Sequence, residues 1–229
     1  GSSCVLVKLV VYDKALIFEN RSPRLRHIYF GSKCWCRHEW RYIKNWEMDL
    51  LEITVVQSDV TEIEVDVLVV NLFEGVTSPS GATGSVDSAL DGLISELISD
   101  GEISGSASEL TLIHTPNNAY PNFKPSRVLV AGLGSSKGFN TDSARKISAG
   151  VIRKLRTVGV KNAATIVHGA GIGNLDAASS TQAVVEGALL GSYRFLKYRT
   201  TDKKRKSDVA QLTIVESDAS KIRSIQAGV

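Results

Sequence analysis

The sequence predicts an α/β fold in which one sheet lies between two layers of helices. Short runs rich in Val and Ile alternate with longer segments whose apolar residues recur every three or four positions. Arg127 to Ala131 reads as a continuous apolar strand, which is typical of a strand that is covered on both faces. Alternation at this spacing favours a parallel or mixed sheet.

We expect strands at 51–56, 65–70, 110–114, 127–131, 163–167 and 209–215. Residues 78–85 are rich in Ser, Gly and Pro and are expected to form a loop, followed by one helix over 86–98 that ends before Gly101. Two further helices are expected, one capped by Asn140 or Thr141 and one over Asp176 to about Leu196. Gly132, Gly134 and Gly138 are expected in an exit loop, 203–206 in a charged turn, and a last helical fragment after Asp218.

Composition divides the chain near residue 48. All three Cys, all three Trp and the single Met lie in the first 48 residues, and residues 1–47 hold nine of the 27 Lys and Arg but four of the 24 Asp and Glu. We therefore expect 1–47 to be a leader or non-native segment, for which disorder is one expectation, and 48–229 to be the domain. The remainder is close to neutral, so overall charge gives no argument for a nucleic-acid partner.

No apolar run reaches the roughly 20 residues that a membrane helix needs, and the best candidate, 5–18, is interrupted by charged residues. A cytoplasmic protein with no membrane contact is therefore expected.

Two ordered motifs go beyond a generic α/β pattern. The first is Val-Leu-Val-Ala-Gly-Leu-Gly at 128–134, followed by Thr-Asp-Ser-Ala-Arg at 141–145 and a helix to Gly159. The second is Glu-Gly-Ala-Leu-Leu-Gly-Ser-Tyr-Arg-Phe at 186–195, which leads to the basic stretch at 203–204. Together, the two motifs resemble the N-terminal domain of the leucyl (cytosol) aminopeptidase family. We expect the small residues of the second motif to lie where its helix approaches the sheet, and Tyr193 and Phe195 to anchor the domain to its neighbour in the parent protein.

The resemblance implies a macro-domain-like three-layer sandwich with a mixed central sheet. It also implies that catalysis belongs to a C-terminal domain, which we expect to come after Val229. In that family, carboxylates and a lysine of the C-terminal domain hold two divalent metals, zinc or manganese, that activate a water. The resemblance therefore implies no catalytic residue, metal ligand or cofactor in this chain. It implies a role in oligomer assembly and active-site access, with the catalytic domain and the neighbouring subunits of a homohexamer as partners.

Cysteine and histidine residues offer two further candidate sites. Cys34, Cys36 and His38, with His27 and Cys4, could in principle bind zinc, but their spacing fits no standard motif and incidental clustering is favoured. His114 and His168 are each expected to end a strand at the carboxyl edge of the sheet, as structural rather than catalytic residues.

The alternative functions are binding modules. The glycine-rich loop at 168–173 could hold a phosphate, which makes a free-standing module for ADP-ribose or a related nucleotide the alternative function. Its site residues would be Gly169, Gly171, Gly173, Gly132 and Gly134. Leu72, Phe73 and Glu74 place bulk and negative charge after Asn71, so tight turning is the favoured role of these glycines.

A third function, DNA binding through the basic stretch at 194–206, is disfavoured because such stretches are usually solvated turns.

Overall fold

The central feature of the fold is a mixed seven-stranded sheet. We analysed a computed structural model, which describes residues 5–7, 51–116, 119–169, 175–194 and 208–229. The strands are β1 (Val5–Val7), β2 (Glu52–Gln57), β3 (Val67–Phe73), β4 (Leu110–His114), β5 (Arg127–Gly134), β6 (Asn162–Thr165) and β7 (Gln211–Glu216). Their order is β1-β2-β7-β6-β3-β5-β4, and only the pairs β1/β2 and β4/β5 at the two edges are antiparallel. The predicted α/β class with a mixed sheet is confirmed.

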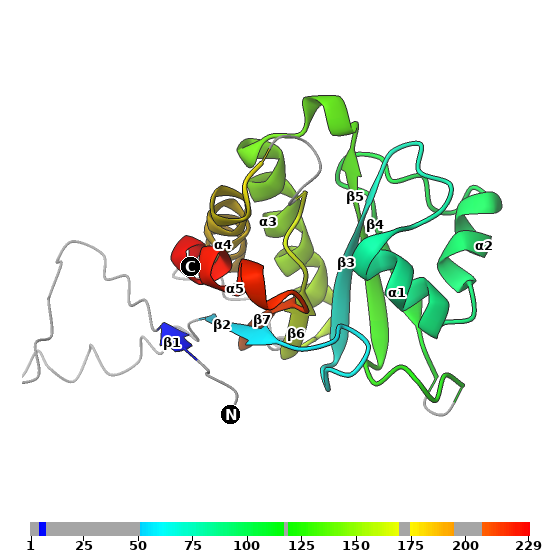
Figure 1. Ribbon diagram of the computed structural model, residues 1–229, viewed down its shortest axis with the longest axis horizontal. Coiled ribbons are helices and arrows are strands. Elements are labelled where there is room, and N and C mark those ends of the chain that lie inside the picture. The colour runs from blue at the N-terminus through cyan, green and yellow to red at the C-terminus, as the bar shows by residue number, and fades with distance from the viewer. Residues whose placement is uncertain (1–4, 8–50, 117–118, 170–174, 195–207) are drawn as a thin grey trace, which may run out of the picture. The chain divides into compact units, whose positions relative to one another are not determined.

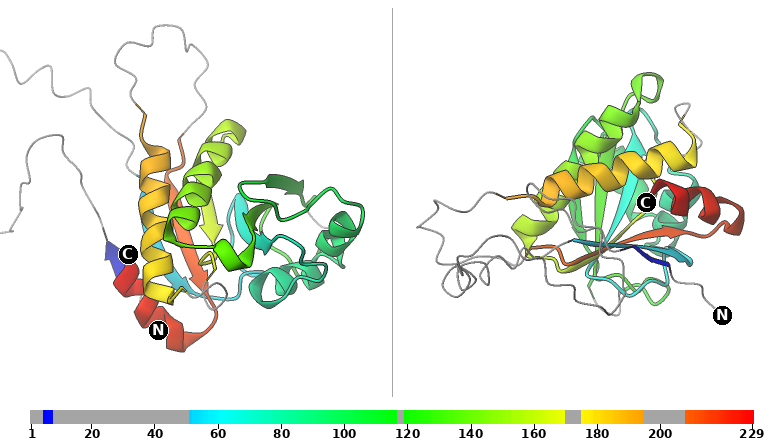
Figure 2. Two further views of the ribbon diagram at one scale, coloured as in Figure 1. Left: turned by 90° about the horizontal axis from the view of Figure 1, so that it is seen from above. Right: turned by 90° about the vertical axis from the view of Figure 1, so that its left-hand side faces the viewer.

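Helices cover both faces of the sheet. They are α1 (Gly81–Ala89), α2 (Leu93–Ser99), α3 (Thr141–Val158), α4 (Ala177–Ser192) and α5 (Ala219–Gly228), with a short 3-10 turn at Ser136–Gly138. Helices α3, α4 and α5 lie on one face, and α1 and α2 on the other (Figures 1 and 2). Along β3, Val67 and Val69 join the core under α3, whereas Leu68 and Val70 join the core under α1. This alternation gives the three layers that the resemblance implied.

Three of the helix starts agree with the sequence signals. Asn140, Asp176 and Asp218 are the N-cap residues of α3, α4 and α5, and each side chain accepts a hydrogen bond from a backbone N–H two or three residues further on. Helix α4 ends at Ser192, four residues before the expected end, because Tyr193 has an extended backbone.

The region between β3 and β4 differs from the prediction in two ways. The expected loop over 78–85 is wrong, since α1 begins at Gly81. The single helix expected over 86–98 is also wrong, because Asp91 and Gly92 have positive φ angles of 55° and 85° and divide it into α1 and α2. Asp87 stabilises this break: its Oδ1 accepts hydrogen bonds from the N–H of Ile94 at 2.8 Å and of Ser95 at 3.0 Å.

Gly132 and Gly134 lie inside β5, so the expected exit loop begins later than predicted. The segment before β4 runs beside them: Gly132 N–H donates to Glu109 O, Ser108 N–H donates to Gly132 O, and Gly134 N–H donates to Gly105 O. Two residues, Ser108 and Glu109, thus oppose Gly132 and form a β-bulge, in which Ser108 has a φ of 67°.

At the other edge of the sheet, β1 pairs antiparallel with β2 through Val5 to Val7. Residues 8–50 lie outside the described part of the chain, so the leader assignment stays a prediction.

Within the described residues, none of the helices combines the length and the apolar character that crossing a membrane requires.

Candidate functional site

The carboxyl edge of the parallel strands is the first candidate site, because ligands of open α/β sheets often bind there. His168 comes after β6 at this edge and is only 1% exposed. Its Nδ1 lies 3.5 Å from the side-chain nitrogen of Asn71 on β3, and its carbonyl oxygen accepts a hydrogen bond from the Ser180 hydroxyl. Burial lowers the pKa of His168 to about 4, so the imidazole is neutral at pH 7. A neutral, enclosed ring held between β3 and α4 is suited to a structural role.

Two aromatic side chains pack together next to Gly169, the residue that follows His168. The rings of Phe73, at the end of β3, and Phe139, after β5, make an edge-to-face contact with centroids 5.4 Å apart. Gly169 has a φ of 74°, and a methyl group on its Cα would overlap the ring of Phe139. The chain after β6 therefore needs glycine at 169 both for its conformation and for this close approach.

The glycines proposed for nucleotide binding fall into three groups. Gly169 borders Phe139. Gly132 and Gly134 face the segment before β4, where an added side chain would overlap the carbonyl oxygen of Ser106 or approach Ala107 to 2.9 Å. Gly171 and Gly173 lie outside the described residues. Ligand binding by these glycines stays a prediction.

His114 lies at the opposite end of the sheet from His168, so the expectation that both lie at the carboxyl edge is wrong for His114. The reason is that β4 runs antiparallel to β5, and the end of β4 therefore meets the start of β5: His114 pairs with Arg127.

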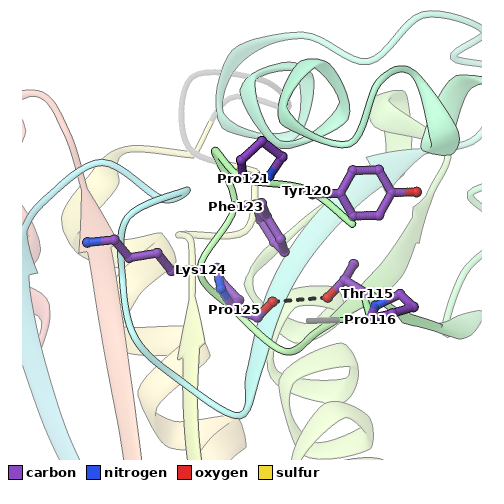
Figure 3. A pocket seen from close by; sticks show the side chains of 7 residues that line it. All are labelled: Thr115, Pro116, Tyr120, Pro121, Phe123, Lys124 and Pro125. Carbon is purple, nitrogen blue, oxygen red and sulfur yellow. Dashed lines mark hydrogen bonds between the residues drawn. The ribbon is translucent and has the colours of Figure 1, made fainter. Parts of the chain in front are cut away.

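Two adjoining hollows open at this amino-terminal edge. The smaller, about 330 Å³, begins at His114 and Arg127, and the larger, about 420 Å³, lies beyond it (Figure 3). The larger is lined by Thr115, Pro116, Tyr120, Pro121, Phe123, Lys124 and Pro125. The Thr115 hydroxyl donates to the carbonyl oxygen of Pro125 at 3.0 Å and ties the two sides of this segment together.

Helices α3 and α4 pack closely through small residues. Added side chains at Gly187 and Gly191 would collide with the α3 backbone at Arg145 and Ala149. The small residues of the second motif were expected to face the sheet; for Gly187 and Gly191 this is wrong, because they face the neighbouring helix.

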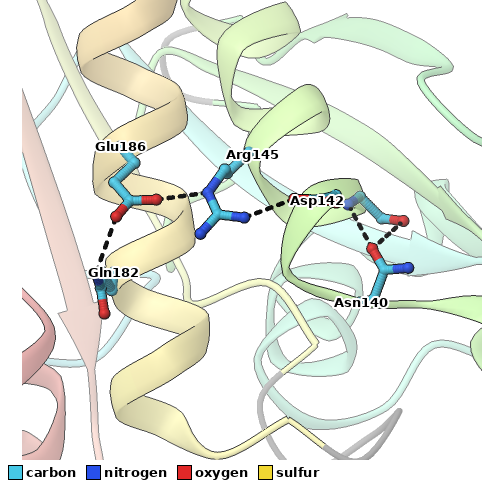
Figure 4. A network of polar contacts seen from close by, with 6 residues as sticks. Asn140, Asp142, Arg145, Gln182 and Glu186 are labelled. Atoms are coloured by element: carbon cyan, nitrogen blue, oxygen red, sulfur yellow. Dashed lines mark hydrogen bonds and ion pairs between the residues drawn. The ribbon is translucent and has the colours of Figure 1, made fainter.

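Polar contacts bridge the outer surfaces of the same two helices (Figure 4). Arg145 lies between two carboxylates, with Nε 2.5 Å from Glu186 and a terminal nitrogen 2.6 Å from Asp142. The hydrogen bond from Arg145 lowers the pKa of Glu186, and Gln182 donates to the same carboxylate at 2.9 Å. These groups are substantially solvent-exposed, so we assign them a modest energetic role.

The end of α4 is anchored on one side and exposed on the other. Arg156 of α3 donates to the carbonyl oxygens of Gly191 and Ser192 at 2.8 and 2.9 Å, and its Nε lies 2.8 Å from Asp208. Burial lowers the pKa of Arg156. On the solvent side, Leu190 is 70% exposed and Tyr193 is 65% exposed, and they are the most exposed large apolar side chains among the described residues. We call this pair the α4 apolar patch.

Among the described residues, the potential metal-binding side chains lie apart from one another. The part of the chain that the structure describes has no group of three or more His, Cys, Asp and Glu side chains placed to hold one ion. The possible zinc ligands Cys4, His27, Cys34, Cys36 and His38 all lie outside the described residues.

The strand order of the mixed sheet and the helices on both of its faces define the class of this protein: an α/β domain of macro-like architecture. Comparison with known proteins supports this class and narrows it. The model of the cytosol aminopeptidase family, N-terminal domain, matches residues 69–202. The chain therefore belongs to the cytosol aminopeptidase family, as an N-terminal domain, which confirms the resemblance of its two motifs.

Individual relatives agree. A probable cytosol aminopeptidase of Alkaliphilus oremlandii is 28% identical over 178 residues, which cover 78% of this chain and 35% of the relative. A tomato leucine aminopeptidase mutant has a TM-score of 0.58 at 22% identity, over 77% of this chain and 35% of that one. An Oceanobacillus iheyensis macrodomain mutant with ADPR has a TM-score of 0.57 at 11% identity, over 78% of this chain and 91% of that one. At these identities the two structures show a shared fold, and the chain spans about a third of the length of its curated relatives.

Proposed function

We propose that this chain is the non-catalytic N-terminal domain of a dinuclear-metal leucyl aminopeptidase, and that it contributes to oligomer assembly and access to the active site. The observation that carries the proposal is the match of the family's N-terminal domain model over 69–202. The parent enzyme would release N-terminal residues from peptides in the cytoplasm. Zinc or manganese would supply Lewis-acid activation of water in its C-terminal domain.

The α4 apolar patch supports the assembly role. Leu190 in the last turn of α4 and Tyr193 just after the helix both belong to the second family motif, and Arg156 holds the carbonyl oxygens of Gly191 and Ser192 between them. A rigid, exposed aromatic residue beside an aliphatic one is a typical contact point between subunits or domains. We propose that the catalytic domain or a neighbouring subunit of a hexamer covers this patch.

The assembly role is tested in the full-length parent protein. Tyr193→Ser combined with Leu190→Ser should lower the fraction of hexamer measured by analytical ultracentrifugation, while the exposed pair Ser179→Ala and Gln182→Ala on the same helix should not. An unchanged sedimentation profile for the Tyr193 and Leu190 variant would remove the patch from the assembly interface.

The domain boundary is part of the proposal. Residues 48–229 would form the domain and 1–47 the leader or non-native segment. Deleting 1–47 should leave a cooperative unfolding transition, with β2 as the new edge strand of the sheet. Loss of that transition would place part of 1–47 inside the folded unit.

Nucleotide binding remains the alternative, and fold likeness to macrodomains is its support. Against it, the ring of Phe139 lies so close to Gly169 that it occupies the space beside this one glycine of the proposed loop. Calorimetric titration with ADP-ribose should give no heat of binding, and a micromolar affinity would establish the alternative.

DNA binding through the basic stretch at 194–206 rests on residues mostly outside the described part of the chain, and a gel shift with duplex DNA tests it.

A further inference from the structure

Strand β4 presents an unpaired main-chain edge. It is the last strand of the sheet, so only one of its sides pairs with β5. On either side of the strand, Glu109 O accepts from Gly132 N–H of β5 at 2.8 Å, and Thr115 N–H donates to the carbonyl oxygen of Ser126, just before β5, at 3.3 Å. Main-chain bonding alternates along an antiparallel pair. The N–H and C=O groups of Thr111 and Ile113 therefore also point towards β5, whereas those of Leu110, Leu112 and His114 point away from it. Within the described chain, nothing bonds to these outward groups.

This edge lacks the features that usually protect edge strands from pairing. Leu110 to Ile113 contains no charged residue and no proline. The bulge at Ser108 and Glu109 lies before the strand and does not interrupt it. The Glu109 carboxylate accepts hydrogen bonds from the Ser104 hydroxyl at 2.8 Å and the Ser106 N–H at 3.0 Å, which fixes the point where the edge begins.

The side chains of β4 are also partly open. Leu110 and Leu112 are half-buried against the core under α3, and Thr111 is half-buried on the other face. A strand added to this edge would cover them and extend both apolar layers of the sandwich.

The two hollows continue the edge beyond its last residue. The smaller begins at His114 itself, and the larger, about 420 Å³, is within the range of about 300–1,000 Å³ that is usual for ligand sites. Five of its seven lining residues carry rings, namely Pro116, Tyr120, Pro121, Phe123 and Pro125 (Figure 3). Strand β4 therefore leads directly into the hollows through His114, Thr115 and Pro116.

We propose that β4 and the adjoining hollows bind an extended, uncharged peptide segment, which adds to the sheet as an antiparallel strand with its N-terminal side chain in the hollow. Main-chain bonds to Leu110, Leu112 and His114 would supply affinity, and the hollow would select the terminal side chain. A second copy of this chain fits less well: two-fold pairing about Leu112 would bring the bulged segment of Ser104 to Glu109 towards the hollow, and its polar groups already bond to one another.

Amide hydrogen exchange tests the predicted geometry. The probe is acetyl-Tyr-Thr-Val-Thr-Val-Thr with a C-terminal fluorescein-labelled lysine amide. In the free domain, the amides of Leu110, Leu112 and His114 should exchange quickly and those of Thr111 and Ile113 slowly. The peptide should protect the first three. Protection that instead rises with protein concentration and needs no peptide would assign the edge to a second copy and overturn the proposal.

Fluorescence anisotropy with strand variants tests the role of the main chain. Leu112→Pro removes an outward N–H without removing a bond to β5, whereas Leu112→Ala shortens the same side chain and keeps the N–H. We expect the dissociation constant for the probe to rise about tenfold more in the proline variant than in the alanine variant. Equal dissociation constants would contradict strand addition. His114→Pro with His114→Ala is the second pair, for use if Leu112→Pro does not give a cooperative unfolding transition.

The peptide supplies an independent control. Two variants of the probe are N-methylated at alternate residues, so that each lacks the N–H donors along one edge of the extended peptide. The variant methylated on the edge that faces away from β4 should bind as the unmethylated probe does. The variant methylated on the edge that faces β4 should not bind. Equal binding by both would overturn the proposal, because strand addition uses a single edge of the peptide.

Discussion

Lowering the pH from 8 to 5 should destabilise this domain through His168. The folded protein holds the imidazole in a site that is 1% exposed, where burial lowers its pKa from the ordinary 6.5 to about 4. The unfolded chain exposes the same ring to water, where it keeps its ordinary pKa. Between pH 6.5 and pH 4, the unfolded state therefore binds a proton that the folded state does not.

The sign and size of the effect depend on this difference. Stability rises with pH wherever the unfolded state binds more protons, so the contribution is complete above pH 6.5 and is lost as the pH falls towards 4. With pKa values of 6.5 and about 4, the free energy of unfolding should fall by about 2 kcal/mol between pH 8 and pH 5 through this residue. A domain of ordinary stability holds about 5–15 kcal/mol, so the change is readily measurable.

Urea unfolding of the unsubstituted chain and of the His168→Gln variant, each at pH 8 and at pH 5, isolates this contribution. The variant removes the titrating group, so its loss of stability between the two pH values should be smaller by about 2 kcal/mol. His114→Gln is the matched control, because His114 is exposed, and it should keep the full pH dependence. If His168→Gln shows the same loss as the natural chain, His168 is not held neutral and the described packing around it is wrong.

Three further substitutions test the packing within and between elements. Asp87→Ala removes the carboxylate that accepts hydrogen bonds at the start of α2 and should lower the free energy of unfolding by about 2 kcal/mol in urea titrations. Gly191→Ala places a methyl group 2.7 Å from the Ala149 backbone and should destabilise by about 1–3 kcal/mol, although alanine favours helices. Gly150→Ala, in the middle of α3, should instead stabilise by up to about 1 kcal/mol, because the new methyl group meets only the Leu110 side chain at 3.7 Å.

The last two variants control each other, since both replace glycine by alanine within a helix. Stabilisation by both would mean that α3 and α4 do not approach closely at Gly191. For Asp87, the comparison is Asp100→Ala, at the other end of α2, where the aspartate is exposed and has an ordinary φ of −77°. Equal effects of the two aspartates would contradict the capping role of Asp87.

Local signals in the sequence were sufficient for much of the fold. The strand at 127–131 and the helix start at Asn140 were predicted because a continuous apolar run and a capping residue act over a few neighbouring positions. The helix break at Asp91 was missed because the apolar spacing continues across it, from Leu90 to Leu93 and Ile94. A backbone reversal that leaves the apolar pattern intact is invisible to periodicity.

The candidate sites depended on partners that sequence spacing cannot reveal. Gly132 was assigned to a loop because glycine is common in loops. It lies in β5 instead, at a point where the backbone of Ser106 approaches closely. His114 was assigned to the wrong end of the sheet because strand direction is a property of the whole topology. The open edge of β4 was missed for the same reason. The absence of charge and proline over 110–113 was the one available signal, and it becomes informative only once β4 is known to lie at the edge.

Assay of the purified chain for hydrolysis of leucine p-nitroanilide, with added Mn²⁺ or Zn²⁺, most directly tests the central claim that this domain is non-catalytic. The full-length parent protein, measured alongside, should hydrolyse the substrate and lose activity on chelation. We expect no hydrolysis above the metal-only blank for the chain of residues 1–229. Metal-dependent, chelator-sensitive turnover by that chain would contradict the account and would place a catalytic centre within this sequence.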